Sequence, residues 1–231
     1  KESNSRVTFD DKKLPEGALP IREWIEEDLD LNTETALAYV VEYIVNRGFN
    51  PTDENFYWSP LDGFESRVIL PFKFHNRIVG YTARKVTAGK PKYLSEQHPN
   101  FVFNADRQNP DQRFVFVCEG PFDALATGGV ALLTNRIHEQ QAKIINQLGR
   151  EVIVIPDQDR AGTNLINDAV DLDWGVAFPN WDLDVKDAND AVNKYGELFV
   201  LVDAIQTAQH GSIKCEIAKK HMLNRIKQNE E

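Results

Sequence analysis

Residues 114–125 read FVFVCEGPFDAL, and residues 152–162 read VIVIPDQDRAG. In both stretches a short run of β-branched and aromatic residues ends near a carboxylate and gives way to a segment with helical spacing. Apolar runs without polar alternation are typical of strands that are covered on both faces. We therefore predict strands at 114–118 and 152–155, each followed by a helix.

The same alternation continues on either side of these two strands. We predict further helices at 122–127, 138–148, 161–172 and 188–194, and further strands at 130–133 and 176–178. This pattern indicates a parallel sheet flanked by helices on both faces, a doubly wound α/β fold. Ligands bind at the carboxyl ends of the strands in this architecture, where Glu119, Asp157 and Asp159 are expected. Asp184 and Asp187 follow the fourth predicted strand.

The rest of the chain differs from this α/β region in its periodicity. A helix is predicted at 33–47, where Asn32 or Thr33 can cap the start and Gly48 ends it, and two antiparallel strands are predicted within 67–86. We divide the chain into an acidic arm or linker at 1–31, a smaller basic α+β subdomain at 32–110, the α/β domain at 111–196 and a helical tail at 197–231.

Charge is distributed unevenly along the chain. The net charge is −10 overall, yet residues 66–94 carry seven Lys and Arg with no Asp or Glu, whereas residues 1–65 have a net charge of −9. Seven like charges without a counter-charge repel one another unless a polyanion is bound. The structural alternative is a basic, solvated sheet edge that prevents aggregation.

Composition excludes several other classes of protein. The chain is 42% apolar and 27% charged, as in ordinary globular proteins, and its longest apolar runs fall far short of the ~20 residues that span a bilayer. Its two cysteines, Cys118 and Cys215, exclude a disulfide framework and a zinc finger, so any metal must be held by oxygen. Because the first residue is Lys1, we expect a piece of a longer polypeptide.

The carboxylates at the strand ends suggest a metal site. Carboxylates from one strand and its neighbour repel one another, and a divalent cation with oxygen ligands, Mg²⁺ above all, neutralises such a cluster. The implied reaction is metal-assisted phosphoryl or nucleotidyl transfer. A structural alternative is that Asp157 and Asp159 cap the helix that starts near Ala161, while Asp184 and Asp187 lie on a solvated face.

Three motifs at these positions resemble the signature of the TOPRIM fold and, more narrowly, that of the DnaG-type primases of bacteria and phages. They are residues 117–125 (VCEGPFDAL), 156–162 (PDQDRAG) and 186–191 (KDANDA). The wording of the third motif is closest to that of phage primases. The resemblance implies that Glu119, Asp157, Asp159 and Asp187 bind divalent metal, Mg²⁺ or Mn²⁺, with Glu119, Asp157 and Asp159 catalytic.

The resemblance extends upstream into the basic block. The upstream motifs are residues 46–48 (NRG), 67–72 (RVILPF), 79–84 (VGYTAR) and 91–94 (PKYL), and they resemble the basic subdomain that precedes the metal site in these primases. By this resemblance Arg47, Arg67, Arg84 and Lys92 bind nucleotide or nucleic acid. Their charge agrees with the polyanion expected above.

The resemblance implies the RNA-polymerase core of a phage-like DNA primase, which synthesises short RNA primers on single-stranded DNA by divalent-metal-dependent nucleotidyl transfer. Expected partners are single-stranded DNA, ribonucleoside triphosphates, and a replicative helicase or zinc-binding module on a separate or missing segment. No membrane partner is expected. The expected location is the cytoplasm, that of the host for a phage protein.

Two alternatives stay open. A TOPRIM nuclease shares the same carboxylates but cuts phosphodiesters. A catalytically degenerate primase-like domain would serve instead as a single-strand DNA or replisome docking module. Two departures from the family pattern motivate this second alternative: a second Lys expected soon after residues 93–94 is absent, and Asn189 stands where bacterial primases have an Asp.

Overall fold

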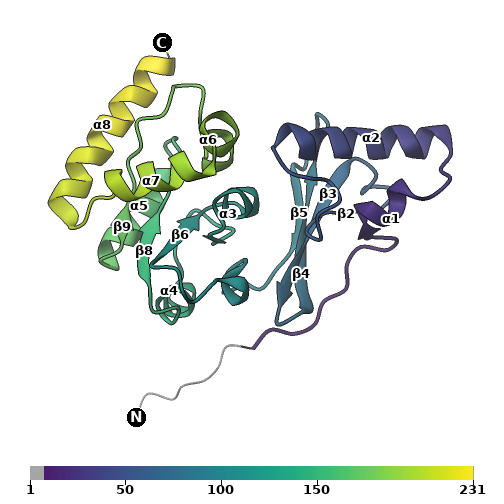
Figure 1. Cartoon of the computed structure of the whole chain (residues 1–231), viewed down its shortest axis with the longest axis horizontal. Helices are drawn as coiled ribbons and strands as arrows, with labels where there is room; N and C mark the ends of the chain where they lie inside the picture. Colours follow the sequence, from purple (N-terminus) through teal and green to yellow (C-terminus); the bar gives the residue numbers. More distant parts are fainter. Residues whose placement is uncertain (1–7, 231) are drawn as a thin grey trace. The chain divides into compact units, whose positions relative to one another are not determined.

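The computed structural model describes residues 8–230 and divides the chain into two compact units, Lys1–Pro99 (unit 1) and Asn100–Glu231 (unit 2) (Figure 1). Each unit has its own sheet. The division at residues 31, 110 and 196 that we expect from the sequence stays a prediction.

Unit 1 is built on an antiparallel sheet with the order β1-β2-β3-β4-β5. Its elements are β1 (Leu19–Pro20), α1 (Ile21–Ile25), α2 (Leu31–Asn46), β2 (Tyr57–Trp58), β3 (Arg67–Phe74), β4 (Arg77–Lys85) and β5 (Tyr93–Glu96). The predicted hairpin is therefore confirmed. His75 and Asn76 connect its strands with φ of 48° and 63°, and two left-handed residues suit the twist of a tight hairpin turn.

Helix α2 begins two residues before the predicted start because its cap is Asp30. The Asp30 carboxylate accepts hydrogen bonds from the backbone N–H groups of Asn32 at 3.0 Å and Thr33 at 3.2 Å. The sequence pattern had suggested Asn32 or Thr33 as the cap, and neither residue has that role. The helix ends before Gly48, whose φ of 81° is a conformation that glycine adopts readily.

Unit 2 holds a parallel sheet with the order β7-β6-β8-β9. Its strands are β6 (Phe114–Cys118), β7 (Val130–Ala131), β8 (Glu151–Val154) and β9 (Gly175–Val176). Its helices are the 3-10 turn η1 (Ala105–Arg107), α3 (Pro121–Thr127), α4 (Glu139–Asn146), α5 (Gly162–Asp171), α6 (Ala188–Tyr195), α7 (Glu197–Thr207) and α8 (Ser212–Glu230). The predicted α/β alternation is confirmed.

Alternate side chains of the central strands pack into two separate cores, one on each face of the sheet. Val115 and Val117 of β6 join a cluster with residues of α4, α5 and α8. Phe116 and Cys118 join a second cluster with residues of α6 and α7. Both faces are thus covered, which explains why the strands are apolar throughout.

No helix within residues 8–230 combines the length and the apolar character needed to cross a membrane. Both cysteines, Cys118 and Cys215, are buried with free thiols, in agreement with the exclusion of a disulfide framework.

Candidate active site

The sheet of unit 2 brings the predicted acidic residues to one edge. Strands β6 and β8 are parallel neighbours with Val117 opposite Val154, so both point their carboxyl ends the same way. Glu119 follows β6 directly, and the turn after β8 carries Asp157. The backbone N–H of Asp157 lies close enough to the Glu119 carboxylate to favour its charged form.

Glu119 is in an environment that disfavours its negative charge. Its Oε1 atom is buried and has no hydrogen-bond partner within residues 8–230. The pKa of Glu119 is raised to about 7: burial is the largest cause, the charge of Asp159 adds to the rise, and the backbone N–H of Asp157 acts in the opposite direction. An unsatisfied buried carboxylate oxygen of this kind is available to a cation.

Asp157 is more strongly perturbed than Glu119. Burial is the largest cause that raises its pKa, to about 9, and the negative charges of Asp123, Glu119, Asp187 and Asp159 add to it. These five side chains are the carboxylate cluster referred to below. Asp157 is therefore protonated at neutral pH unless a cation offsets its neighbours.

Two members of the carboxylate cluster also hold helix starts. Asp159 Oδ1 accepts a hydrogen bond of 2.9 Å from the N–H of Gly162, and Asp187 Oδ1 accepts one of 2.8 Å from the N–H of Asp190. The capping role that we weighed as the structural alternative for Asp157 and Asp159 is thus present for Asp159, and Asp187, for which we had weighed a solvated face, is a helix cap as well. Within residues 8–230, no three Asp, Glu, His or Cys side chains converge closely enough to hold a metal ion as they stand.

Gly162 explains how the turn after β8 fits so closely under α5. A Cβ atom at this position would lie 2.4 Å from the carbonyl oxygen of Asp157, which is closer than real Cβ atoms approach. Only glycine allows the start of α5 to pack against the backbone of Asp157. The glycine of the PDQDRAG motif therefore fixes the position of that carboxylate.

Asp123 belongs to the site although the sequence analysis did not single it out. It lies in the first turn of α3, is buried, and accepts a hydrogen bond of 3.0 Å on Oδ1 from the N–H of Asn189. A Cβ atom on Gly120 would lie only 2.7 Å from Asp123 Oδ2. A signal was available: an Asp four residues after Glu119, in a helix starting at Pro121, faces the strand end it follows.

Asn189 and Asp184 can now be placed. Asn189 is buried and uses its backbone N–H to hold Asp123. Asp184 is exposed and pairs with Lys194 at 2.8 Å, as does Asp182 at 2.9 Å. Asp184 is therefore part of the solvated face that we weighed as an alternative, and it lies outside the carboxylate cluster.

Three of the four predicted basic residues gather around two tyrosines in unit 1. The guanidinium groups of Arg47 and Arg84 lie 5.5 and 5.4 Å from the ring centre of Tyr43. Arg84 and Lys92 lie 5.2 and 5.6 Å from the ring centre of Tyr93, and Arg84 Nη1 also donates to the Tyr93 hydroxyl. We call this set the cation–tyrosine cluster, and stacking on the rings orients its charges.

Arg67 differs from the other three predicted basic residues in its burial, and its role in ligand binding stays a prediction. It is only 3% exposed. Its guanidinium donates to four backbone carbonyls, those of Gly63 at 2.9 Å, Ala83 at 3.2 Å, Pro91 at 2.9 Å and Lys92 at 3.4 Å. Arg67 therefore holds the segment that carries Lys92 and Tyr93 in place.

A cavity of about 320 Å³ in unit 2 opens beside Asp159. Its lining includes Gln158, Trp181 and two cationic residues, Lys186 and Arg225. Arg225 Nη1 donates to the carbonyl of Pro179 at 3.4 Å, so it is held by the backbone. Asp182 lines the cavity as well, so charges of both signs face this space beside one member of the carboxylate cluster.

Curated proteins similar in sequence to this chain are DNA primases. The DNA primase of Staphylococcus aureus (strain COL) is 28% identical over 142 residues, which cover 54% of this chain and 23% of that protein. The DNA primase of Halalkalibacterium halodurans is 31% identical over 127 residues, 48% of this chain and 21% of that protein. The chain thus spans less than a quarter of the length of these relatives. No protein-family model matches it.

Solved structures with a similar fold are primase cores. A DnaG primase catalytic domain bound to ssDNA has a TM-score of 0.57 at 17% identity, covering 82% of this chain and 77% of that one. A DnaG catalytic core has a TM-score of 0.53 at 17% identity, with 89% of both chains covered. The primase fragment of the bacteriophage T7 primase-helicase protein has a TM-score of 0.50 at 16% identity over 70% of this chain and 72% of its own.

Proposed function

We propose that this chain, which has the fold of DnaG primase catalytic cores, is the nucleotidyl-transfer core of a DNA primase. It would join ribonucleotides into a short RNA primer on a single-stranded DNA template. The observation that carries the proposal is the carboxylate cluster, since the fold alone serves more than one chemistry. In this cluster Asp157 has a pKa of about 9 because of burial and four acidic neighbours.

The donor chemistry of these residues suits a divalent cation, Mg²⁺ or Mn²⁺, and binding would draw their side chains closer together than they lie in the described chain. The donors are all oxygens, which hard cations prefer, and Glu119 offers a buried Oε1 atom without a partner in the described chain. Glu119 and Asp157 would hold the ion, with Asp159 and Asp187 as further ligands. When bound, such an ion stabilises the negative charge on the attacking oxygen and on the leaving pyrophosphate.

The protein residues would orient the substrates around that ion. Asp123 holds the start of α6 through Asn189, and so keeps Asp187 near the strand ends. Arg47, Arg84 and Lys92 would bind the triphosphate or the template backbone, because guanidinium and ammonium groups pair with phosphate oxygens. In support of this role, Arg84 Nε is buried without a hydrogen-bond partner within residues 8–230.

The proposed partners follow from this activity. They are single-stranded DNA, ribonucleoside triphosphates, and a replicative helicase or zinc-binding module that would deliver the template. The acidic balance of the chain supports the need for delivery, because a net charge of −10 weakens attraction to DNA outside the basic block. We place the activity in the cytoplasm, and the wording of the KDANDA motif supports a phage-like origin.

The experiment that tests the proposal measures ribonucleotide incorporation on single-stranded DNA with Mg²⁺ or Mn²⁺. Wild type is expected to make short RNA, and the Asp157→Ala, Asp159→Ala double variant is expected to make none. The matched control is Asp171→Ala with Asp184→Ala, which removes the same charge from exposed positions outside the carboxylate cluster and the cavity and should keep full activity. Absence of product from wild type, or equal product from both double variants, rejects the proposal.

The same reactions distinguish the two alternatives. Metal-dependent cleavage of DNA without ribonucleotide uptake would identify a TOPRIM nuclease. Binding of single-stranded DNA with neither incorporation nor cleavage would identify a docking module. The helix-capping hydrogen bonds of Asp159 and Asp187 favour this second alternative, since they occupy one oxygen of each carboxylate.

A further inference from the structure

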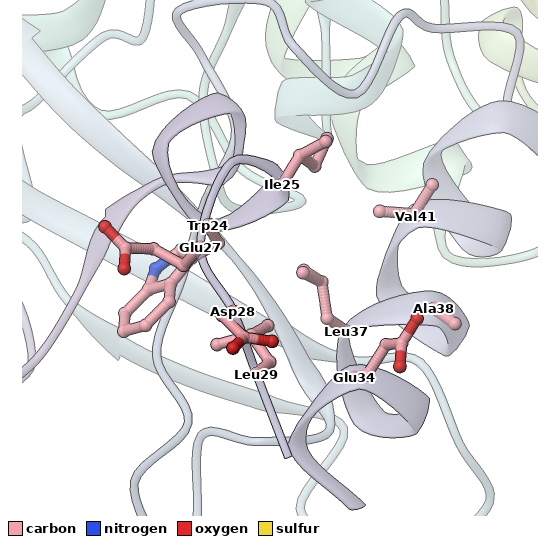
Figure 2. Close-up of a pocket in the computed structure, with 9 residues that line it drawn as sticks. All are labelled: Trp24, Ile25, Glu27, Asp28, Leu29, Glu34, Leu37, Ala38 and Val41. Carbon is pink, nitrogen blue, oxygen red and sulfur yellow. The ribbon is translucent and has the colours of Figure 1, made fainter. Parts of the chain in front are cut away.

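A groove of about 400 Å³ lies between α1 and α2 of unit 1 and includes none of the residues assigned above (Figure 2). Its floor is apolar. Figure 2 shows Leu37 and Val41 of α2 facing Ile25 of α1, with Trp24 and Leu29 alongside. Ile25 is 51% exposed, so an apolar surface here meets solvent in the isolated chain.

The rim of the groove is acidic. Glu27, Asp28 and Glu34 contribute to the lining and are exposed. Across residues 23–46 there are seven acidic residues and no Lys or Arg. No cation among residues 8–230 forms an ion pair with these three rim carboxylates. The groove therefore presents a negative potential around an apolar floor.

Both walls of the groove are held in place by contacts outside it. Trp24 Nε1 donates to the carbonyl of Trp58 at 3.0 Å, and the two indole rings pack edge to face at 5.3 Å. The α2 wall is fixed by the Asp30 cap at its start and by the buried side chain of Val40. A groove formed before its ligand arrives loses little conformational entropy on binding.

We propose that this groove docks a basic, amphipathic segment of a partner protein. Apolar side chains of that segment would cover Ile25, Leu37 and Val41, while its Lys or Arg side chains pair with Glu27, Asp28 and Glu34. An amphipathic helix in an apolar groove is a common mode of peptide recognition, and complementary charge on the rim sets the orientation and the choice of partner.

The charge of the rim decides against other occupants. Nucleic acid and an anionic membrane both carry negative charge, and the three exposed rim carboxylates, Glu27, Asp28 and Glu34, would repel either. A small neutral molecule would contact the apolar floor but form no ion pair with the acidic rim. A basic peptide uses both features of the groove.

The test measures binding of a defined probe to the full chain. The probe is a fluorescein-labelled 18-residue synthetic helix. Leu recurs at positions i, i+3 and i+4 along one face of the helix, and every other position is Lys. The control peptide has Glu in place of every Lys. Fluorescence anisotropy should give a Kd of about 1–100 μM for the Lys probe and none for the Glu probe. When the Lys probe binds, the amide chemical shifts of the isotope-labelled protein should change within residues 24–41.

Two variants separate the rim from the floor. Glu27→Lys with Asp28→Lys should weaken binding at least about tenfold, since it reverses the rim charge. Ala38→Trp fills the groove without a change of charge and should also weaken binding about tenfold. Circular dichroism verifies that both variants keep their helices.

The matched control is Asp62→Lys with Asp171→Lys, which changes net charge equally at exposed sites outside the groove. Its affinity should stay within about twofold of wild type. The proposal is overturned by equal loss in this control, by equal binding of the Glu probe, by shifts that map elsewhere, or by no binding at all.

Discussion

The Oδ1 atom of Asp123 accepts a hydrogen bond of 3.0 Å from the backbone N–H of Asn189, 66 residues further along the chain. This bond joins the first turn of α3 to the first turn of α6, and so connects the EGPFD and KDAND stretches in space. Both groups are buried, so no water replaces the bond if the acceptor is lost.

Loss of the Asp123 acceptor is expected to destabilise unit 2. Asp123→Ala leaves a buried N–H without a partner and should lower the free energy of unfolding by about 1–3 kcal/mol. Asp123→Asn keeps an oxygen for that N–H and should unfold close to wild type. Urea denaturation measures both, and equal stability of the Ala and Asn variants would contradict the role given to this bond.

Asp157 is expected to make the chain less stable as the pH rises. Its pKa is about 9 in the folded chain against an ordinary 3.8, so the folded state binds more protons than the unfolded state between these values. Stability contributed by Asp157 is therefore present below about pH 4 and is lost as the pH approaches 9. The sign is opposite to that of a salt-bridged carboxylate.

Asp157→Asn should remove this loss because Asn cannot ionise. In EDTA the variant should melt several degrees above wild type at pH 8, since each kcal/mol shifts the midpoint by about 2–4 °C for a chain of this size. At pH 4 the two midpoints should coincide. A variant that is less stable than wild type at pH 8 would show that burial and neighbouring charges do not perturb Asp157 as described.

Arg84 is expected to contribute to affinity for phosphate rather than to stability. Arg84→Ala should weaken binding of single-stranded DNA or nucleoside triphosphate about tenfold and lower the salt dependence of DNA binding by about one charge. Arg84→Lys should retain only part of the wild-type affinity, because Lys keeps the positive charge but loses the planar stacking on Tyr43 and Tyr93. Lys13→Ala, outside the basic block, is the control and should bind as wild type.

Arg67 should behave in the opposite way. Arg67→Met removes a side-chain donor from four backbone carbonyls in buried or partly buried hydrogen bonds and should lower the free energy of unfolding by about 2–4 kcal/mol. Arg113→Met is the control, since Arg113 is exposed, where it pairs with the surface residue Glu151 and stacks on the ring of Phe114; its effect should stay within about 0.5 kcal/mol. Chemical denaturation measures the free energy of unfolding of both variants. An Arg67→Met variant as stable as wild type would contradict the structural role given to Arg67.

The strands of unit 2 could be predicted from sequence because burial on both faces demands uninterrupted apolar runs. Strand β6 has the predicted bounds, Phe114–Cys118. Strands β7 and β9 are shorter than predicted, with two residues each, because apolar residues continue beyond the hydrogen-bonded ladder. The α2 cap was misplaced because Asp30, Asn32 and Thr33 are all residues that favour helix starts.

The site was less predictable where it depends on contacts distant in sequence. Asp123 lies in the first turn of α3 rather than directly at a strand end, and its hydrogen-bond partner Asn189 is 66 residues away in sequence. Arg67 and Arg84 are residues of the same type in the same basic block. Only the backbone carbonyls that surround Arg67 in three dimensions distinguish it from Arg84. The local sequence pattern indicates charge and periodicity, but it does not indicate which charged side chains become buried by tertiary packing.

The central claim is that Glu119 and Asp157 hold a divalent cation, and calorimetric titration of the chain with Mg²⁺ or Mn²⁺ at pH 7 tests it most directly. Asp157 has a pKa of about 9 and Glu119 one of about 7, so at pH 7 the ion must displace a proton from Asp157 and about half a proton from Glu119. Between one and two protons per ion should therefore be released, which titrations in buffers of different ionisation enthalpy measure. Glu119→Gln with Asp157→Asn should abolish both the binding and the proton release. No metal binding by wild type, or binding that survives in the double variant, would contradict the account.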